Sequence, residues 1–333
     1  MDSPAIKAEK LNKTYKVPDL KSGFKGTLLN LFHRQHHLVR AVNDISFDIT
    51  PGELVSYIGP NGAGKSTTIK MLTGIINPDS GNLQILGQSY NQHRNKILKS
   101  IGAMFGNRSR LLWNLPVMET YRFFKDLYEI EDKDYRQNLE FLCSNMEIED
   151  IVKKQARVLS LGQRIRCELV AILLHSPEIV FLDEPTIGLD SWAKWKIREE
   201  LKRINRELKT TIIITSHDTN DVDIASRIIL IDQGKKLFDG KKKNFIDQYS
   251  QQDILVKIEF GAGKTVHQHE FENIIKPKKI EACEKNNLIF KFNRENPLFQ
   301  KLREIDYLHP IVDFHLQTES LDEVIRNIYE HSK

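Results

Sequence analysis

Residues 59–67 read GPNGAGKST and fit the pattern G-x-x-x-x-G-K-[ST]. The apolar run ELVSYIG leads into this segment, and the helical pattern GKSTTIKMLTG overlaps its end. Glycines at this spacing let backbone N–H groups turn toward phosphate oxygens. Lys65 can neutralise the outer phosphates of a nucleotide, and the hydroxyl of Ser66 can bind Mg²⁺. The segment therefore predicts a strand, a phosphate-binding loop and a helix in succession, rather than a glycine turn that merely joins two elements.

Further polar side chains follow two apolar runs of strand length. Asp183 and Glu184 follow EIVFL, and His217 follows TTIIITS. Ligands of open parallel sheets bind at the carboxyl ends of the strands, so we expect these side chains to meet at one edge. Asp183 then holds Mg²⁺, Glu184 polarises an attacking water, and His217 contacts the γ-phosphate. The alternatives are two acids that only end a strand and a histidine that is satisfied within its own loop.

Composition excludes several classes of protein. The chain has 333 residues, of which 40% are hydrophobic and 28% charged, as in ordinary soluble proteins. We expect no membrane span and no signal peptide, because no apolar run reaches the roughly 18–20 residues that a span needs and residues 1–10 have no apolar h-region. Cys143, Cys167 and Cys283 lie far apart, which argues against disulfides and zinc. The net charge of +4 is too small to indicate nucleic-acid binding.

The alternation of strand and helix patterns predicts an α/β fold with a mainly parallel sheet. We expect short strands at 4–15 and 41–50, with an insertion at 16–40 between them, and a helical subdomain at about 107–175. The segment RIILIDQGKKLFDG predicts a hairpin that turns at 232–234.

The pattern changes after about residue 250, so we expect a first domain at 1–245 and a small accessory α+β domain at 251–333. In the second domain ILVKIEF, NLIFKF and PIVDFHL predict strands, and 297–305 and 320–331 predict helices. This domain has no catalytic constellation. Regulation, dimerisation and binding of a membrane partner all remain open for it.

These motifs, in this order over residues 4–240, resemble the ATP-binding subunit of ABC transporters. The resemblance implies a P-loop NTPase fold with a RecA-like core, an antiparallel β subdomain and a helical subdomain. It implies an ATPase that uses ATP and Mg²⁺, with Tyr15 stacked on the adenine. It also implies that the loop residues hold the nucleotide, namely Gly59, Pro60, Asn61, Gly62, Ala63, Gly64, Lys65, Ser66 and Thr67.

A second anion-binding helix start lies at SLGQ, residues 160–163. Ser160 can cap the helix, and the helix N-terminus favours anions. By resemblance this is the family's signature motif. Two copies of the chain then pair head to tail in an ATP-dependent homodimer, and Ser160, Gly162, Gln163 and Asp190 of one copy complete the nucleotide site of the other, as two-fold symmetry requires.

Two positions depart from the family pattern. Leu161 stands where the signature motif usually has glycine. Asn107, in FGNRSR, stands where the family usually has a glutamine that helps to hold Mg²⁺ and senses the membrane partner. Asparagine is one methylene shorter, and a displacement of ~1 Å can cost on the order of 100-fold in rate. We still expect an active ATPase, because Glu184 and His217 are present.

The segments FGNRSRLLWNLPVMETYRFFKDLY and LSLGQRIRCELVAILLHSP resemble a bacterial multidrug- and antibiotic-export branch whose partner is a separate ABC-2 type permease. This implies export of a drug-like, lipid or polysaccharide substrate, from a peripheral position on the cytoplasmic face of the cell membrane. The basic insertion, with Leu28, Leu29, Leu31 and Phe32, suits a membrane surface or a permease helix, or else it is a solvated loop. A soluble ABC-type ATPase or a nucleotide-dependent regulator is the alternative, and we expect no nucleic-acid partner.

Overall fold

The computed structural model describes residues 3–18, 36–106, 109–216, 218–249, 253–261, 266–275, 280–284, 286–293, 298–317 and 321–331. The chain divides into two compact units, Met1–Lys242 and Lys243–Lys333. No helix of the described residues is long and apolar enough to cross a bilayer.

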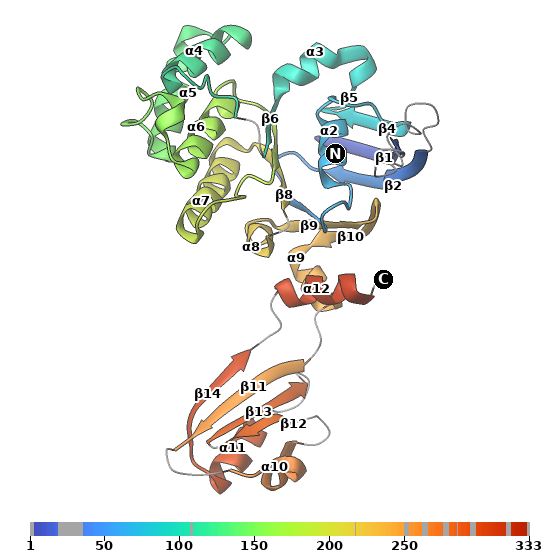
Figure 1. Cartoon of the computed structure of the whole chain (residues 1–333), viewed down its shortest axis with the longest axis vertical. Helices are drawn as coiled ribbons and strands as arrows, with labels where there is room; N and C mark the ends of the chain where they lie inside the picture. The colour runs from blue at the N-terminus through green and yellow to red at the C-terminus, as the bar shows by residue number, and fades with distance from the viewer. Residues whose placement is uncertain are drawn as a thin grey trace, which may run out of the picture. The chain divides into compact units, whose positions relative to one another are not determined.

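A six-stranded sheet forms the centre of the first unit (Figure 1). Its strand order is β10-β9-β3-β8-β7-β6, and all neighbours are parallel except β9 and β10. Every residue of β3, β7 and β8 is buried, which explains their continuous apolar sequences. The predicted parallel α/β sheet is therefore confirmed. The bounds are β3 Leu54–Ile58, β6 Ile101–Phe105, β7 Ile179–Asp183, β8 Thr211–Ser216, β9 Arg227–Asp232 and β10 Lys235–Lys241.

An antiparallel sheet, β2-β1-β4-β5, covers one side of the central sheet. Its strands are β1 Ile6–Pro18, β2 His36–Ile49, β4 Ser80–Ile85 and β5 Gln88–Ser89. The limits expected for the first two strands were too short, because Pro18 pairs with His36 and both strands continue into the predicted insertion. Residues 36–40 are all exposed. Their sequence therefore lacks the alternation of buried and exposed residues by which a strand can be predicted. The apolar residues of the insertion, Leu28, Leu29, Leu31 and Phe32, lie outside the described residues.

Helices complete the first unit. In Figure 1, α4, α5, α6 and α7 lie on the opposite side of the central sheet from the antiparallel sheet. The bounds are α2 Lys65–Leu72, α3 Tyr90–Ser100, α4 Val117–Leu127, α5 Asp132–Met146, α6 Leu161–Leu173, α7 Ser191–Leu208, α8 Thr219–Val222 and the 3₁₀ turn η1 Ala156–Val158.

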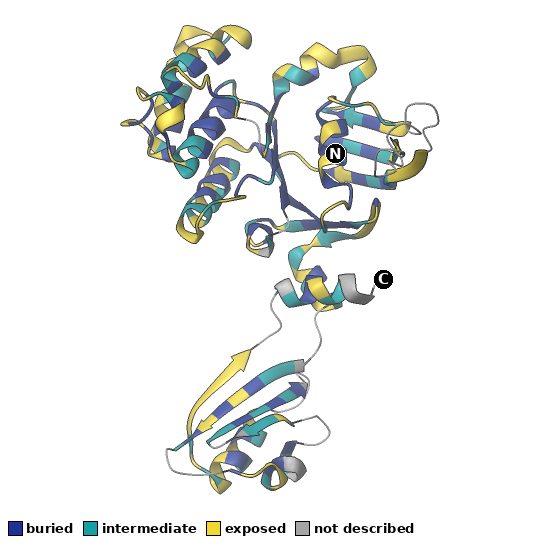
Figure 2. Cartoon of the chain, viewed as in Figure 1, coloured by how far each residue is buried: buried dark blue, intermediate teal, exposed yellow. Residues whose placement is uncertain are grey.

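Alternate residues of the central strands enter two hydrophobic cores. Val180 and Leu182 of β7 pack among α4–α7, whereas Phe181 packs with α2 and the antiparallel sheet. Ile213 of β8 likewise faces away from Ile212 and Ile214. Figure 2 shows the central sheet as mainly buried ribbon, whereas the strands of the antiparallel sheet mix buried residues with intermediate and exposed ones. This two-sided packing fixes the strand ends that carry the candidate site.

The second unit contains an antiparallel sheet of order β12-β13-β11-β14. Its apolar face packs under α10 and α11. The sequence predicts β11, β13, β14, α11 and α12, but it does not predict α10 or β12. The bounds are α9 Lys242–Tyr249, β11 Asp253–Phe260, α10 Gln268–Ile275, β12 Ile280–Glu284, β13 Asn287–Asn293, α11 Leu298–Leu308, β14 Ile311–Gln317 and α12 Leu321–His331.

Candidate nucleotide-binding site

The phosphate-binding loop joins β3 to α2. Gly64 precedes the first helical residue with φ of 105°, and a side chain there would collide with the carbonyl oxygen of Ala41, so only glycine fits. The Lys65 ammonium is buried in the loop and donates to the carbonyl oxygens of Gly59 at 2.7 Å and Pro60 at 3.1 Å. Burial lowers the pKa of Lys65, opposed by the nearby acids Glu184 and Asp183. The loop is therefore wrapped closely around its cation.

The carboxyl ends of β3, β7 and β8 are neighbours, as the sequence predicts, because these strands pair in parallel. Asp183 ends β7 and is buried, and its Oδ1 accepts hydrogen bonds from the Ser66 hydroxyl at 3.2 Å and from the Thr215 hydroxyl. A hydroxyl and a carboxylate oxygen at this separation are the hard oxygen donors that Mg²⁺ prefers. Ser66 and Asp183 therefore fit a magnesium site that includes phosphate oxygens.

Glu184 holds an unusual backbone conformation, with φ of 54°. Its backbone N–H donates to both the carbonyl oxygen and the hydroxyl oxygen of Thr215, each at 3.1 Å. Left-handed conformations of residues other than glycine are costly and persist where the surroundings enforce them. Strand β8 thus fixes the peptide of Glu184 and the direction in which its side chain leaves the sheet.

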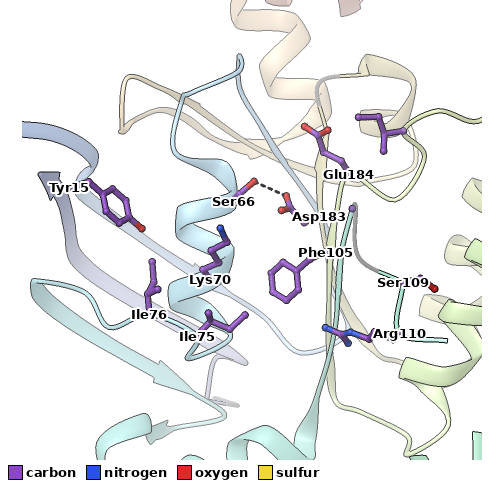
Figure 3. A pocket seen from close by; sticks show the side chains of 12 residues that line it. Tyr15, Ser66, Lys70, Ile75, Ile76, Phe105, Ser109, Arg110, Asp183 and Glu184 are labelled. Carbon is purple, nitrogen blue, oxygen red and sulfur yellow. Dashed lines mark hydrogen bonds between the residues drawn. The ribbon is translucent and has the colours of Figure 1, made fainter. Parts of the chain in front are cut away.

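A cavity of about 750 Å³ lies beside these groups. Tyr15, Ser66, Asp183 and Glu184 line it together, and Figure 3 shows the two acids and Ser66 near one another, with Tyr15 across the cavity on β1. Tyr15 is 37% exposed, so its ring is accessible to a stacking partner. The wall also contains side chains that have no predicted role, namely Lys70, Ile75, Ile76, Phe105, Ser109 and Arg110.

The signature segment begins α6. The Ser160 hydroxyl accepts a hydrogen bond from the backbone N–H of Gln163 at 3.3 Å, and the Gln163 side chain accepts one from the Ser160 backbone N–H at 3.1 Å. This reciprocal pair is a capping box, which fixes the first turn of the helix. The acceptor role of the Ser160 oxygen leaves its hydroxyl proton available to an external acceptor.

The departure at Leu161 is explained by packing. Leu161 lies against the core of the helical subdomain, and its side chain is close to Gly188 in the loop before α7. A side chain at Gly162 would meet the Cβ of Ala193 at 3.5 Å, an ordinary contact. Asp190 caps α7 by accepting the Ala193 N–H at 2.9 Å. Within the chain, Ser160, Gly162, Gln163 and Asp190 do not line the cavity that contains Ser66 and Glu184.

Asp221 is a buried acid that the sequence analysis missed. Its carboxylate accepts hydrogen bonds from the Thr186 hydroxyl at 2.6 Å, the Ser216 hydroxyl at 2.7 Å and the Arg198 Nε at 2.6 Å. Thr186 lies two residues after Glu184, Ser216 ends β8, and Arg198 is on α7. One carboxylate thus joins three elements around the site, whereas in the sequence Asp221 is only one of several acids in DTNDVD.

A second acid, Asp218, extends this cluster. Its carboxylate forms ion pairs with Lys194 at 2.7 Å and Arg198 at 3.3 Å. Its backbone N–H donates to the Ser216 hydroxyl at 2.9 Å. The residues on both sides of His217 are therefore held by α7. His217 and Asn107 lie outside the described residues, so their roles stay predictions from the sequence.

Comparison with known proteins identifies the family. Residues 42–187 match the family described as "ABC transporter". The ABC transporter ATP-binding protein CA_C1368 of Clostridium acetobutylicum is 31% identical over 233 residues, which are 69% of this chain and 82% of the relative. The linearmycin resistance ATP-binding protein LnrL of Bacillus subtilis is 31% identical over 215 residues, 64% of this chain and 68% of the relative.

Other relatives serve different transporters. The energy-coupling factor transporter ATP-binding protein EcfA1 of Oenococcus oeni is 28% identical over 220 residues, 66% of this chain and 78% of the relative. A similar solved structure is the dimeric post-hydrolysis state of the ATP-binding cassette MJ0796 bound to ADP and Pi. It has a TM-score of 0.57 and 25% identity, and the match covers 71% of this chain and 98% of that structure. This chain therefore belongs to the family of ABC transporter ATP-binding proteins and is an ATPase subunit.

Proposed function

We propose that this ATPase powers a separate ABC-2 type permease that exports a drug-like, lipid or polysaccharide substrate. The observation that carries the catalytic part is the convergence of Ser66, Asp183 and Glu184 on one cavity that also holds Tyr15. The subunit then lies on the cytoplasmic face of the membrane, where a permease is accessible to it.

ATP binding uses both ends of this cavity. Tyr15 stacks on the adenine, a contact worth ~1–3 kcal/mol by analogy with base stacking in nucleic-acid complexes. The N–H groups of residues 59–67 and the Lys65 ammonium hold the phosphates. Ser66 and Asp183, together with Asn107 from the sequence pattern, hold Mg²⁺, which neutralises charge on the phosphates when it is bound.

Hydrolysis requires a base beside the γ-phosphate. Glu184 accepts a proton from the attacking water, the water oxygen bonds to the γ-phosphorus, and the bond from that phosphorus to the β–γ bridging oxygen breaks. The products are ADP and inorganic phosphate. The strained backbone of Glu184 supports this role, because it fixes the carboxylate before the water arrives. His217 contacts the γ-phosphate.

The two copies complete each other's sites. The first N–H groups of a helix have no intrahelical acceptors, and the capping box presents those of α6 together with the Ser160 hydroxyl. Ser160, Gly162 and Gln163 of one copy then bind the γ-phosphate held by the other copy, and Asp190 crosses at the same interface. Gly162 has no side chain, which supports a close approach of this kind.

Each part of the chain has its own proposed role. Residues 1–245 form the ATP-binding domain, with the helical subdomain at about 107–175, and residues 251–333 form an accessory domain. The insertion at 16–40 is basic and apolar, which suits a membrane surface or a permease helix, or else it is a solvated loop. The name of the linearmycin resistance relative supports export, although the relatives also include an energy-coupling factor subunit.

The identity of the membrane protein that copurifies with this chain distinguishes these transporter classes. We expect the tagged full chain, solubilised from its own membranes in mild detergent, to retain a multi-span permease that mass spectrometry identifies as ABC-2 type. Recovery of an energy-coupling factor scaffold instead would contradict the export assignment. Recovery with ribosomes and no membrane protein would favour the soluble-ATPase alternative.

A further inference from the structure

The outer edge of β14 is an exposed strand edge in the second unit. Strand order places β14 beside β11, and no other described strand pairs with it. Val312 is 68% exposed, Phe314 40% and Leu316 44%, so three apolar side chains at alternate positions remain in contact with solvent. A strand edge of this length normally carries a lysine, a proline or a cover that prevents pairing. The sequence IVDFHLQ has neither a lysine nor a proline. Its one acid, Asp313, accepts a hydrogen bond from the Phe314 backbone N–H at 2.8 Å.

Two apolar side chains of β14, Phe314 and Leu316, continue the core face of the sheet. The pairing with β11 is irregular at Val312, because Phe260 pairs with Ile311 instead. Leu316 pairs with Val256 and Phe314 pairs with Ile258, and residues directly opposite each other point to the same face. Val256 and Ile258 are fully buried under the helices. The hydrophobic surface therefore extends past the last strand, and a further strand beside β14 would cover its exposed part.

The sequence of β14 is complementary to itself. In an antiparallel pair of two β14 strands centred on Phe314, Val312 lies opposite Leu316 and Asp313 lies opposite His315. The Asp313 carboxylate and the His315 imidazole already contact each other along the strand, with 3.2 Å between Oδ2 and Nε2. Moving the centre to Asp313 or to His315 places like residues opposite each other, which loses this complementarity. One register is therefore preferred.

We propose that the second units of two copies of this chain pair through β14 and form one continuous eight-stranded sheet. Such a contact is isologous, because the same patch meets itself across a two-fold axis, and it closes at two copies. It needs no nucleotide. The accessory unit then holds two copies together while the ATP sites open and close.

The test uses a variant that cannot form the ATP-dependent dimer, so that any remaining dimer must use another contact. The full chain with Lys65→Ala, in nucleotide-free buffer, is analysed by sedimentation equilibrium. We expect a dimer, and we expect Val312→Lys in that background to raise its dissociation constant at least tenfold, because two lysines then face apolar partners. Phe299→Lys is the matched control, since Phe299 is 73% exposed and belongs to α11 rather than to β14. A monomeric Lys65→Ala chain, or equal dimerisation of both lysine variants, would overturn the proposal.

A charge exchange tests the register. His315→Asp places aspartates opposite each other and weakens the dimer, whereas adding Asp313→His restores the complementary pairs and the affinity. Phe314→Cys gives a second readout that does not depend on affinity. Residues opposite each other in an antiparallel pair have Cα atoms about 4.5–5.5 Å apart, which permits a disulfide.

Mild oxidation of Phe314→Cys should therefore cross-link two chains, whereas Tyr307→Cys, at a 92% exposed position on α11, should not. The unmodified chain, with its three native cysteines, gives the background. Cross-linking no faster than in Tyr307→Cys, or no recovery of affinity in the exchanged pair, would overturn the pairing of two β14 strands.

Discussion

The hydroxyl of Thr186 donates a 2.6 Å hydrogen bond to the buried carboxylate of Asp221. This bond joins the segment after Glu184 to the short helix after His217. Because Asp221 also accepts from Ser216 and Arg198, one carboxylate fixes the two loops that carry the base and the proposed phosphate contact. Asp221 touches no substrate group in the proposed site, so we expect it to act as a positioning residue.

Asp221→Asn should lower kcat for ATP hydrolysis by on the order of 10- to 100-fold, because the Glu184 and His217 loops lose their common anchor. Nucleotide affinity should change little, since the phosphate-binding loop does not contact this carboxylate. Steady-state kinetics separates kcat from KM. Asp223→Asn is the control, because Asp223 is an exposed acid that forms an ion pair with Lys242. Equal kcat for the two variants would show that the cluster only stabilises the fold.

Glu184→Gln should reduce turnover at least 100-fold while nucleotide affinity is retained. The amide has the shape of the carboxylate but cannot accept the proton from water at neutral pH. A fluorescent ATP analogue measures binding, and phosphate release measures turnover. Loss of binding together with turnover would mean that the left-handed backbone at Glu184, and not its base, had been disturbed.

Tyr15→Ala should weaken ATP binding by ~5- to 150-fold, which corresponds to ~1–3 kcal/mol of stacking. Tyr15→Phe should bind ATP almost as the parent does, since the ring remains. Isothermal titration of both variants gives the two affinities. If both bind ATP as tightly as the parent, the adenine does not lie at this end of the cavity.

His175 makes the stability of the first unit depend on pH. Its ring stacks on Tyr128 with centroids 3.8 Å apart, and burial lowers the pKa of His175 to about 4. The unfolded chain binds a proton near pH 6.5, so between about pH 6.5 and 4 the unfolded state binds more protons than the native state. The free energy of unfolding should therefore fall by about 3 kcal/mol as the pH drops through this range.

The contribution of His175 is measured by difference. Urea titrations at several pH values should show a shallower pH dependence in His175→Gln than in the parent. His93→Gln, at an exposed position, should keep the slope of the parent. An unchanged slope in His175→Gln would assign the acid sensitivity to other groups.

Local sequence patterns predict much of this architecture. The apolar runs at β3, β7 and β8 predict buried parallel strands, and parallel pairing then places Ser66, Asp183 and Glu184 at one edge. These inferences succeed because burial on both faces leaves a strong signal in the sequence. The turn at 232–234 is also correct, since Gln233 and Gly234 both adopt positive φ.

The remaining features depend on tertiary contacts. Residues 36–40 extend a hairpin through backbone pairing alone, so their exposed side chains give no strand signal. Asp221 becomes important only when folding brings Thr186, Ser216 and Arg198 to it. The left-handed backbone of Glu184 is likewise imposed by Thr215 on the neighbouring strand. The periodicity of apolar residues along the sequence does not predict these contacts.

The central claim is that each nucleotide is enclosed by two copies of the chain. Gly162→Asp should leave the isolated chain folded, since a Cβ there makes ordinary contacts with Ala193 at 3.5 Å and Leu189 at 3.8 Å and the Ser160 cap is retained. It should place a negative charge against the partner's γ-phosphate. Lys65→Ala removes the phosphate site of its own chain. Each variant alone should therefore be inactive.

The most direct measurement is the ATP turnover of the two variants expressed together. A mixed pair contains one complete site, formed by the intact loop of the Gly162→Asp chain and the intact signature of the Lys65→Ala chain. With equal amounts, half of the pairs are mixed, so turnover should recover to about a quarter of that of the parent. Turnover that stays at the level of the separate variants would contradict a nucleotide site shared between two chains.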